Sequence, residues 1–330
     1  MKIKIQELRD LILKALNKHG YTDEEAPVIA DILLYTQFRG VSHGVVKLLS
    51  DEFGKNPEAG EPQLIKETTI SALIDGAKGS GIFVMNRAVD IALSKALEHG
   101  IAIVGTNNTF ASTGALGYYV ERLSAKSLVG IALSSSPETV PPHGSSEAVF
   151  GTNPIAISIP TLDEPLTLDM ATAAMPFFAV MEAKFAGKTL PEGIGYDKAG
   201  NSTTDPGAIV DSGSINPFDF GPKGAGLAMM FGILAGPLVG AAALGSGETW
   251  KNWGNLIIAI DPKIFGDLET FKKAVTDHVT RTKSAKRLPG VEEIFVPGER
   301  SSKKSVQAQS EGMVEIGESI INGLREFVGE

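Results

Sequence analysis

Ser42, His43 and Gly44 form a short polar motif that could take part in proton transfer. An unperturbed imidazole has a pKa of about 6.5, so a histidine can donate or accept a proton near neutral pH. Ser42 places a hydroxyl beside the imidazole, and Gly44 has no side chain to keep a ligand away from the backbone. These residue types permit general acid–base catalysis, with His43 as the proton donor.

The other histidines are weaker candidates. His19 and His99 lie at the ends of predicted helices, where a positive charge complements the helix dipole, and His278 lies in a charged helix. We interpret these three as structural. His143 follows two prolines in a loop, which suits a ligand contact and an ordinary surface turn equally well.

Two glycine-rich loops, at 76–81 and 221–226, open predicted helices. Free backbone N–H groups at a helix start can bind a phosphate, and Lys223 in the second loop could assist. A flexible turn before a closely packed helix explains each loop about as well. No Gly-x-Gly-x-x-Gly motif follows a strand and no P-loop occurs, which disfavours the Rossmann and P-loop folds.

Composition excludes several other classes of function. The chain has 330 residues, and its net charge of −9 without a basic block excludes nucleic acid as a partner. It has no cysteine, so disulfides, thiol nucleophiles and thiolate metal sites are excluded. No metal-binding spacing of histidines and carboxylates occurs, and we expect a metal-free mechanism. The mixed charges of residues 1–18 differ from a secretory signal and predict a cytoplasmic protein.

Hydrophobic periodicity predicts the elements that position these residues. A first helix ends at His19, and a second begins with a capping box formed by Thr22 and Glu25 and ends near Arg39. The sequence that follows alternates between predicted strands and helices, which predicts a mixed α/β fold, with a long loop at 193–214. The predicted strands are 70–74, 101–105, 128–134, 155–159, 166–170 and 256–260, and the predicted helices are 83–99, 117–126, 175–186, 268–281 and 313–328.

The segment 224–244 carries no charge and is long enough to be a candidate membrane span, which needs about 20 apolar residues. Five glycines and Pro237 interrupt it, and both flanks continue as α/β sequence. We therefore favour a buried core helix over a membrane span.

Several motifs together resemble the malate/L-lactate dehydrogenase family, which is distinct from the Rossmann dehydrogenases. The resemblance spans nearly the whole chain and rests on 42–45, 107–108, 117–119, 151–154, 168–172, 203–206, 222–224 and 297–299. It implies an α/β fold with an unusual mixed β-sheet cofactor domain and a helical N- and C-terminal region. We expect three parts: helical residues 1–68, a cofactor- and substrate-binding core over 69–300, and a C-terminal helical segment over 301–330.

The resemblance also implies roles for individual residues. In that family the histidine of the Ser-His-Gly motif protonates the substrate during reduction by NADH or NADPH, so this role falls to His43, with Ser42 orienting it. Residues expected to line the dinucleotide site are Asp169, Met170, Ala171, Thr172, Ala173, Pro222, Lys223, Gly298 and Glu299. The expected substrate is a small 2-oxo acid of the malate, lactate or diketo-acid type, and the expected assembly is a homodimer.

Two departures from the family pattern bear on substrate binding. Lys47 stands where many relatives have an arginine, and it replaces a bidentate fork by a point charge. Thr109 stands where relatives often have a histidine. Lys47, Thr109 and His143 are predicted to contact the substrate. The alternatives are an altered substrate, such as a cyclic imine acid or a sugar acid, a cofactor-binding protein without catalysis, or a His43-dependent hydrolase or isomerase that uses no nicotinamide.

Overall fold

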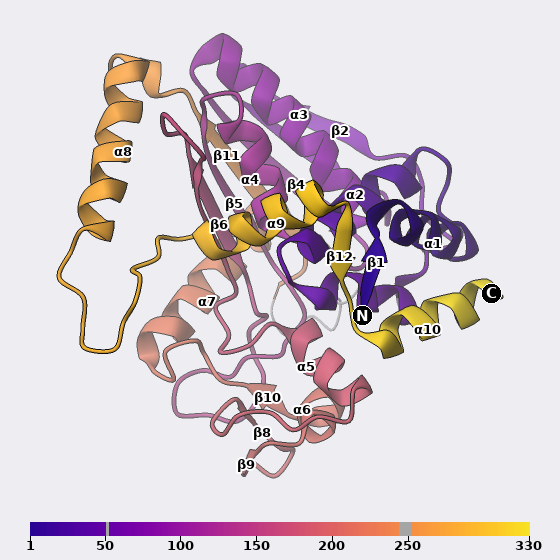
Figure 1. The fold of residues 1–330 in the computed structure, drawn as a ribbon. Helices are drawn as coiled ribbons and strands as arrows, with labels where there is room; N and C mark the ends of the chain where they lie inside the picture. Colours follow the sequence, from indigo (N-terminus) through magenta and orange to yellow (C-terminus); the bar gives the residue numbers. More distant parts are fainter. Residues whose placement is uncertain (51–52, 244–251) are drawn as a thin grey trace.

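A seven-stranded mixed sheet forms the centre of the molecule (Figure 1). The computed structural model describes residues 1–50, 53–243 and 252–330, with Ser42 and His43 described by their backbone alone. β3 and β4 are parallel, and the other neighbours are antiparallel, unlike a Rossmann sheet. In spatial order the strands are β2 (Gln63–Glu67), β3 (Ser71–Asp75), β4 (Ile101–Thr109), β11 (Trp253–Ile260), β5 (Val129–Ser134), β6 (Ile155–Ile159) and β7 (Leu166–Met170).

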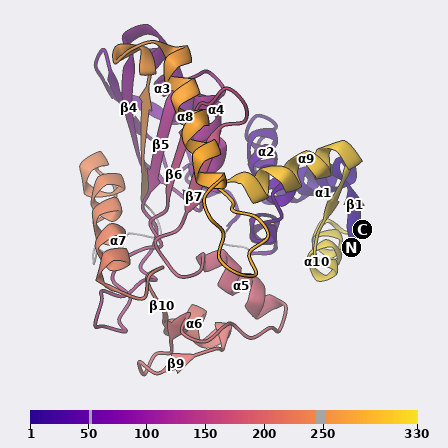
Figure 2. The same cartoon turned by 60° about the vertical axis from the view of Figure 1, so that its left-hand side comes forward.

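Alternating side chains of the sheet enter two different hydrophobic clusters. Ile74 and Val104 join the large cluster formed with α3 (Gly81–His99) and α4 (Leu116–Ser124). Leu73 and Leu133 join a smaller cluster with α7 (Pro222–Ala235) and η3 (Pro237–Val239). Because successive strand residues point to opposite faces, the sheet lies between these helices, and Figure 2 shows α7 across the sheet from α4. The predicted mixed α/β fold is confirmed.

The two ends of the chain meet in one helical region. β1 (Lys2–Lys4) pairs antiparallel with β12 (Met313–Glu315), and α1 (Ile5–Lys18) packs against α10 (Glu318–Val328) (Figure 1). The predicted helix over 313–328 is therefore wrong in its first turn, where the chain forms a strand instead. α9 (Glu299–Glu311) has few apolar residues; it lies mostly in the segment 301–330 that was expected to be helical, but it was not predicted as a separate helix. The division into parts ending at 68 and 300 stays a prediction.

The capping box before α2 (Glu25–Phe38) is confirmed. The Thr22 hydroxyl accepts a hydrogen bond from the Glu25 N–H at 3.2 Å, and the Glu25 carboxylate accepts one from the Thr22 N–H at 2.9 Å. These reciprocal bonds satisfy two backbone donors that the first turn leaves free. α2 then runs to η1 (Ser42–Leu49), a 3₁₀ helix that begins with the Ser-His-Gly motif.

The predicted long loop over 193–214 is wrong. It contains a small antiparallel sheet of β8 (Gly195–Tyr196), β9 (Ser202–Thr203) and β10 (Ser214–Ile215), together with α6 (Pro206–Ser212). Strands of two residues are too short to show a period of two in the sequence. α6 packs against α5 (Phe177–Phe185), and a second hydrophobic cluster lies in this region.

A helix does form in the segment 224–244, but the prediction that it is buried is wrong for many of its large apolar side chains, which are exposed. α7 buries the small residues Gly224, Ala225, Ala228 and Ala235. Its exposed apolar residues are Leu227, Met229, Met230, Ile233 and Leu234, and Leu238 of η3 continues them. By length and composition alone, Pro222–Val239 passes as a candidate membrane span, with 33% of the segment buried. Leu244, the last residue of the predicted helix, lies outside the described residues.

The C-terminal half of the core ends with η4 (Pro262–Ile264) and α8 (Leu268–Lys283). The Asp267 side chain caps α8 by accepting a hydrogen bond from the Thr270 N–H at 2.8 Å. Figure 2 shows the chain after α8 passing to α9. This path brings Gly298, at the start of α9, back to β7.

Candidate active site

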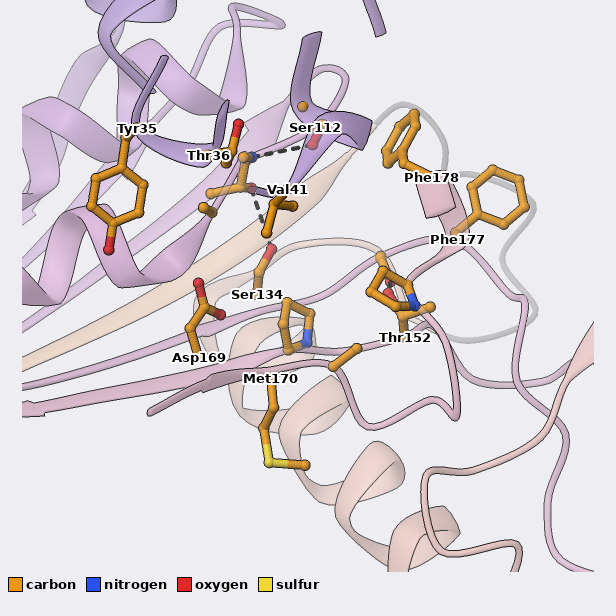
Figure 3. A pocket seen from close by; sticks show the side chains of 18 of the residues that line it. Tyr35, Thr36, Val41, Ser112, Ser134, Thr152, Asp169, Met170, Phe177 and Phe178 are labelled. Carbon is orange, nitrogen blue, oxygen red and sulfur yellow. Dashed lines mark hydrogen bonds between the residues drawn. The ribbon is translucent and has the colours of Figure 1, made fainter. Parts of the chain in front are cut away.

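A cavity of about 440 Å³ lies where η1, α5, β7 and the start of α9 meet. Figure 3 shows Tyr35 and Asp169 on one side of it and Phe177 and Phe178 on the other. Five of the predicted site residues line this cavity: Lys47, Asp169, Met170, Ala171 and Gly298. We refer to it as the central pocket.

Lys47 is buried in the wall of the central pocket, with 6% of its surface exposed. Its ammonium donates a hydrogen bond to Ser112 Oγ at 2.7 Å and lies 4.3 Å from the centre of the Phe178 ring. Within the described part of the chain no carboxylate pairs with it. Burial lowers the pKa of Lys47 to about 7, because a charge without an anionic partner is poorly solvated there.

Gly44 connects the Ser-His-Gly motif to the central pocket, which it also lines. A Cβ atom at this position would lie 2.1 Å from Thr36 Oγ1, so a larger residue could not pack against α2 here. The backbone of Ser42 and His43 forms the start of η1. The side chains of Ser42 and His43 lie outside the described part of the structure, and their catalytic roles stay predictions.

An apolar wall faces Lys47. Phe177 and Phe178 come from the first turn of α5, and Trp253 comes from the start of β11. The Trp253 indole N–H is buried without a hydrogen-bond partner in the described structure. Sequence reasoning missed all three residues as site residues, and the adjacent phenylalanines at the start of a predicted helix were the available signal.

Asp169 lies at the end of β7, and its carboxylate accepts a hydrogen bond from the Gly117 N–H at 2.8 Å. Desolvation by the surrounding protein raises the pKa of Asp169 to about 6, and the hydrogen bond from the Gly117 N–H partly opposes this shift. Asp169 is an exposed residue that lines the central pocket. Nearby, Arg39 pairs with Glu121 at 2.6 Å and stacks 3.6 Å from the centre of the Tyr35 ring.

The segment after Asp169 is held by backbone hydrogen bonds. The Thr172 N–H and hydroxyl both donate to the Thr152 carbonyl, at 2.9 and 2.8 Å. Ala173 forms an isolated bridge with Pro217, and the Phe218 N–H donates to the Thr172 carbonyl at 2.9 Å. Thr172 and Ala173 are buried behind the residues that line the central pocket. They connect the pocket to the segment that leads into α7.

Pro222 and Lys223 form the first turn of α7 and are exposed. The Asp219 carboxylate accepts hydrogen bonds from the Gly221 and Gly224 N–H groups, each at 3.0 Å. A carboxylate of the chain itself therefore occupies the amides predicted to face a phosphate. Pro222 and Lys223 do not line the central pocket, and their cofactor roles stay predictions.

Gly298 lines the central pocket and also a second cleft of about 480 Å³. It has a φ of +80°, and a Cβ atom here would lie 2.5 Å from the Thr167 carbonyl oxygen, so glycine permits the close approach of α9 to β7.

Glu299 lines the second cleft and pairs with Lys283 and, at 3.1 Å, with Lys303. Desolvation raises the pKa of Glu299, but hydrogen bonds from these lysines outweigh it and lower the pKa to about 2. The two clefts adjoin, because both are lined by Arg39, Glu121, Thr167 and Gly298.

Thr109 and His143 do not line the central pocket. Thr109 is fully buried, and its hydroxyl donates to the Trp253 carbonyl at 2.7 Å. This bond makes Thr109 a support for Trp253, which does line the pocket. His143 is exposed in a turn. Their substrate-binding roles stay predictions without geometric support.

Among the described residues, no group of three histidine, aspartate or glutamate side chains could hold a metal ion.

Comparison with known proteins shows the family to which the chain belongs. The family model for malate/L-lactate dehydrogenase matches residues 3–325. The chain belongs to the malate/L-lactate dehydrogenase family. It is 35% identical over 341 residues to the malate/(S)-sulfolactate dehydrogenase of Methanothermus fervidus, with 100% of this chain and 98% of the relative covered.

Two further members of the malate/L-lactate dehydrogenase family support this assignment. The ureidoglycolate dehydrogenase (NAD(+)) of Escherichia coli strain K12 is 31% identical over 326 residues, covering 95% of this chain and 92% of the relative. The solved structure of sulfolactate dehydrogenase from Methanocaldococcus jannaschii has a TM-score of 0.84 at 32% identity and covers 100% of this chain and 97% of that one. The named relatives are dehydrogenases of small acids, so this is a family of oxidoreductases.

Proposed function

We propose that the protein reduces a small 2-oxo acid to the 2-hydroxy acid with NADH or NADPH, and that His43 is the general acid. The observation that carries this proposal is the buried Lys47 in the same pocket as Asp169, Met170 and Ala171. One cavity thus contains a cation, Lys47, that could bind a substrate carboxylate, and a wall against which the flat nicotinamide ring could lie. The relatives' names supply the class of reaction.

The residues present fit a nicotinamide cofactor. The central pocket offers apolar surface at Phe177 and Met170, and its continuation past Gly298 leaves room for the rest of a dinucleotide. When bound, the cofactor would supply the hydride. The protein would hold the acceptor carbonyl beside it and exclude water, which strengthens every electrostatic contact in the site.

The protein's own contribution is binding and proton transfer. Reduction of a carbonyl leaves a developing alkoxide, which needs a proton near neutral pH, and His43 has the residue type for this role. Lys47 follows one turn of η1 later and would bind the substrate carboxylate. Ser42 would orient His43. In the reverse direction His43 would take the proton from the hydroxyl.

We further propose that the protein is a cytoplasmic homodimer. The exposed apolar residues of α7 and η3 form a surface that we name the α7 face: Leu227, Met229, Met230, Ile233, Leu234 and Leu238. A contiguous apolar surface of this kind usually contacts a partner. A second copy of the chain would cover it.

Absorbance assays of NADH and NADPH oxidation with a panel of 2-oxo acids test the proposed function. We expect oxidation that depends on both the protein and an acid. Calorimetric titration of each cofactor gives the complementary reading. Undetectable binding of both cofactors would overturn the proposal and favour a hydrolase or isomerase, whereas binding without turnover would indicate a protein that has lost catalysis.

A further inference from the structure

Among the residues that the structure describes, the charges that line the central pocket leave one cation for a ligand. Among the described residues, the charged lining residues are Arg39, Lys47, Glu121 and Asp169. The Arg39 guanidinium pairs with Glu121 at 2.6 Å and also stacks on Tyr35, so that pair has no net charge. Lys47 has no carboxylate partner within this part of the chain, and Asp169 adds a negative charge when ionised.

The Lys47 ammonium has the capacity for one carboxylate. It carries three N–H donors, of which one is used by Ser112 Oγ at 2.7 Å. The Phe178 ring, with its centre 4.3 Å away, covers one side of the ammonium. A carboxylate can take the remaining donors, and its charge would then offset that of Lys47.

The rest of the pocket favours apolar groups. Its wall includes Phe177, Phe178, Trp253 and Val41, and its remaining polar side chains are mostly hydroxyls such as that of Ser136. A second acidic group bound there would lose its hydration and meet no cation among the described residues, which is strongly unfavourable. An alkyl or aromatic group would instead remove apolar surface from water.

We infer that the central pocket selects 2-oxo acids with one carboxylate and an uncharged apolar side chain, and that it disfavours acids with a second carboxylate or a sulfonate. This inference rests on the proposed function, because it takes the central pocket as the substrate site. It deepens that function by naming the substrate class. Relatives named for malate or sulfolactate act on acids with two acidic groups, so this chain would differ from them in substrate.

Binding of product acids tests the selection without requiring turnover. Calorimetry with the full chain and saturating NADH, or NADPH if it binds tighter, would compare 2-hydroxyisocaproate with malate. We expect 2-hydroxyisocaproate to bind at least ~10-fold more tightly, since a buried charge without a partner is costly. Equal binding, tighter malate binding, or no binding of either acid would overturn the inference. Absence of cofactor oxidation with every 2-oxo acid would instead count against the proposed function.

A second cation in the wall should reverse the selection. Val41 lines the pocket just before η1, and Figure 3 labels it among the lining side chains. We expect Val41→Arg to lower the Kd ratio of malate to 2-hydroxyisocaproate by ~10-fold or more, while Val41→Leu leaves that ratio within ~3-fold of the original. An unchanged ratio in a folded Val41→Arg protein, checked by circular dichroism, would contradict the charge argument.

Discussion

The Asp169 carboxylate accepts a hydrogen bond from the Gly117 N–H at 2.8 Å, which joins the end of β7 to the first turn of α4. A Cβ atom on Gly117 would lie 3.1 Å from Asp169 Oδ2 and 2.8 Å from the Tyr35 hydroxyl. The segments around Gly117 and Asp169 are distant in the sequence, and they approach each other so closely that only glycine fits at position 117 without displacing a neighbour. This contact fixes one side of the central pocket, where Asp169 and Tyr35 both lie.

Gly117→Ala should destabilise the protein and disturb this side of the pocket. Alanine is the better helix former by about 1 kcal/mol, but here its methyl group must displace Tyr35 and Asp169. We expect a net loss of ~1–2 kcal/mol in the free energy of unfolding, measured by urea denaturation. Gly226→Ala is the matched control, because Gly226 lies in α7 and a Cβ there meets no atom of the same chain within 4 Å; both variants are made in the Met230→Glu background, because Gly226 adjoins the α7 face. That control should gain ~0.5–1 kcal/mol, and a similar gain in Gly117→Ala would contradict the packing argument.

Lys47→Met should stabilise the protein while weakening acid binding. The folded pKa of Lys47 is about 7, below its ordinary value of 10.5, so the buried charge costs stability fully below about pH 7 and less as the pH rises toward 10.5. Methionine keeps much of the packing without the charge. We expect a gain of ~1–3 kcal/mol near pH 6, measured by urea denaturation, and the gain should shrink toward pH 10. The exposed Lys263→Met should stay within ~0.5 kcal/mol of the original protein. A loss of stability in Lys47→Met would show that the lysine has an anionic partner.

Acid binding should weaken above about pH 7 for the same reason. Lys47 loses its proton there, and a neutral amine no longer attracts a carboxylate. We expect the Kd of 2-hydroxyisocaproate in the presence of NADH to rise by up to ~10-fold per pH unit. Asp169, whose pKa is about 6, faces the same pocket and should make binding stronger below that pH, as its carboxylate becomes neutral.

The Lys47→Arg variant tests whether Lys47, and not another titrating group, causes the pH dependence of acid binding. Arginine keeps its charge across the accessible pH range, so the rise above pH 7 should disappear in this variant. If the rise persists, another group is responsible, and His43 would be the first to test. The comparison uses calorimetric titrations at matched ionic strength, because screening alone changes the affinity for anions.

The sequence predicted the sheet well and the pocket in part. β6 and β7 match the predicted ranges residue for residue, because alternating burial within a sheet produces a period of two. Lys47 and Asp169 were predicted as site residues because the motifs around them resemble those of the malate/L-lactate dehydrogenase family. Thr109 was expected to face the substrate, but whether its hydroxyl points to a pocket or to the Trp253 carbonyl depends on the register of β4 and β11. Phe178 and Ser112 were missed because their contacts with Lys47 are tertiary.

α7 shows a further limit of pattern reasoning. Its hydrophobic residues surround the helix on every side, which predicts burial, but the rest of the chain covers only the side with small residues. A sequence pattern does not distinguish burial within a chain from burial between copies of it.

Met230→Glu should therefore break the proposed dimer. Met230 is 59% exposed within one protomer, and a buried carboxylate on the α7 face would oppose association. Light scattering after size-exclusion chromatography should show a dimer for the original protein and a monomer for the variant. Leu97→Glu, at a residue of α3 that is 53% exposed, should leave the mass unchanged. A monomeric original protein would remove the basis for the dimer, and a dimeric Met230→Glu would place the interface elsewhere.

His43→Ala tests the proton donor separately from cofactor binding. Removal of a general acid usually lowers the rate of the chemical step by ~10²–10⁴, whereas the affinity for NADH should stay nearly constant because the residues expected to bind it are unchanged. Stopped-flow measurement of a single turnover reports the chemical step, and calorimetry reports the cofactor affinity. His278→Ala, in the charged helix α8, is the matched control and should retain full activity. Equal single-turnover rates for His43→Ala and the original protein would refute the assignment, since the developing alkoxide would then receive its proton from another group.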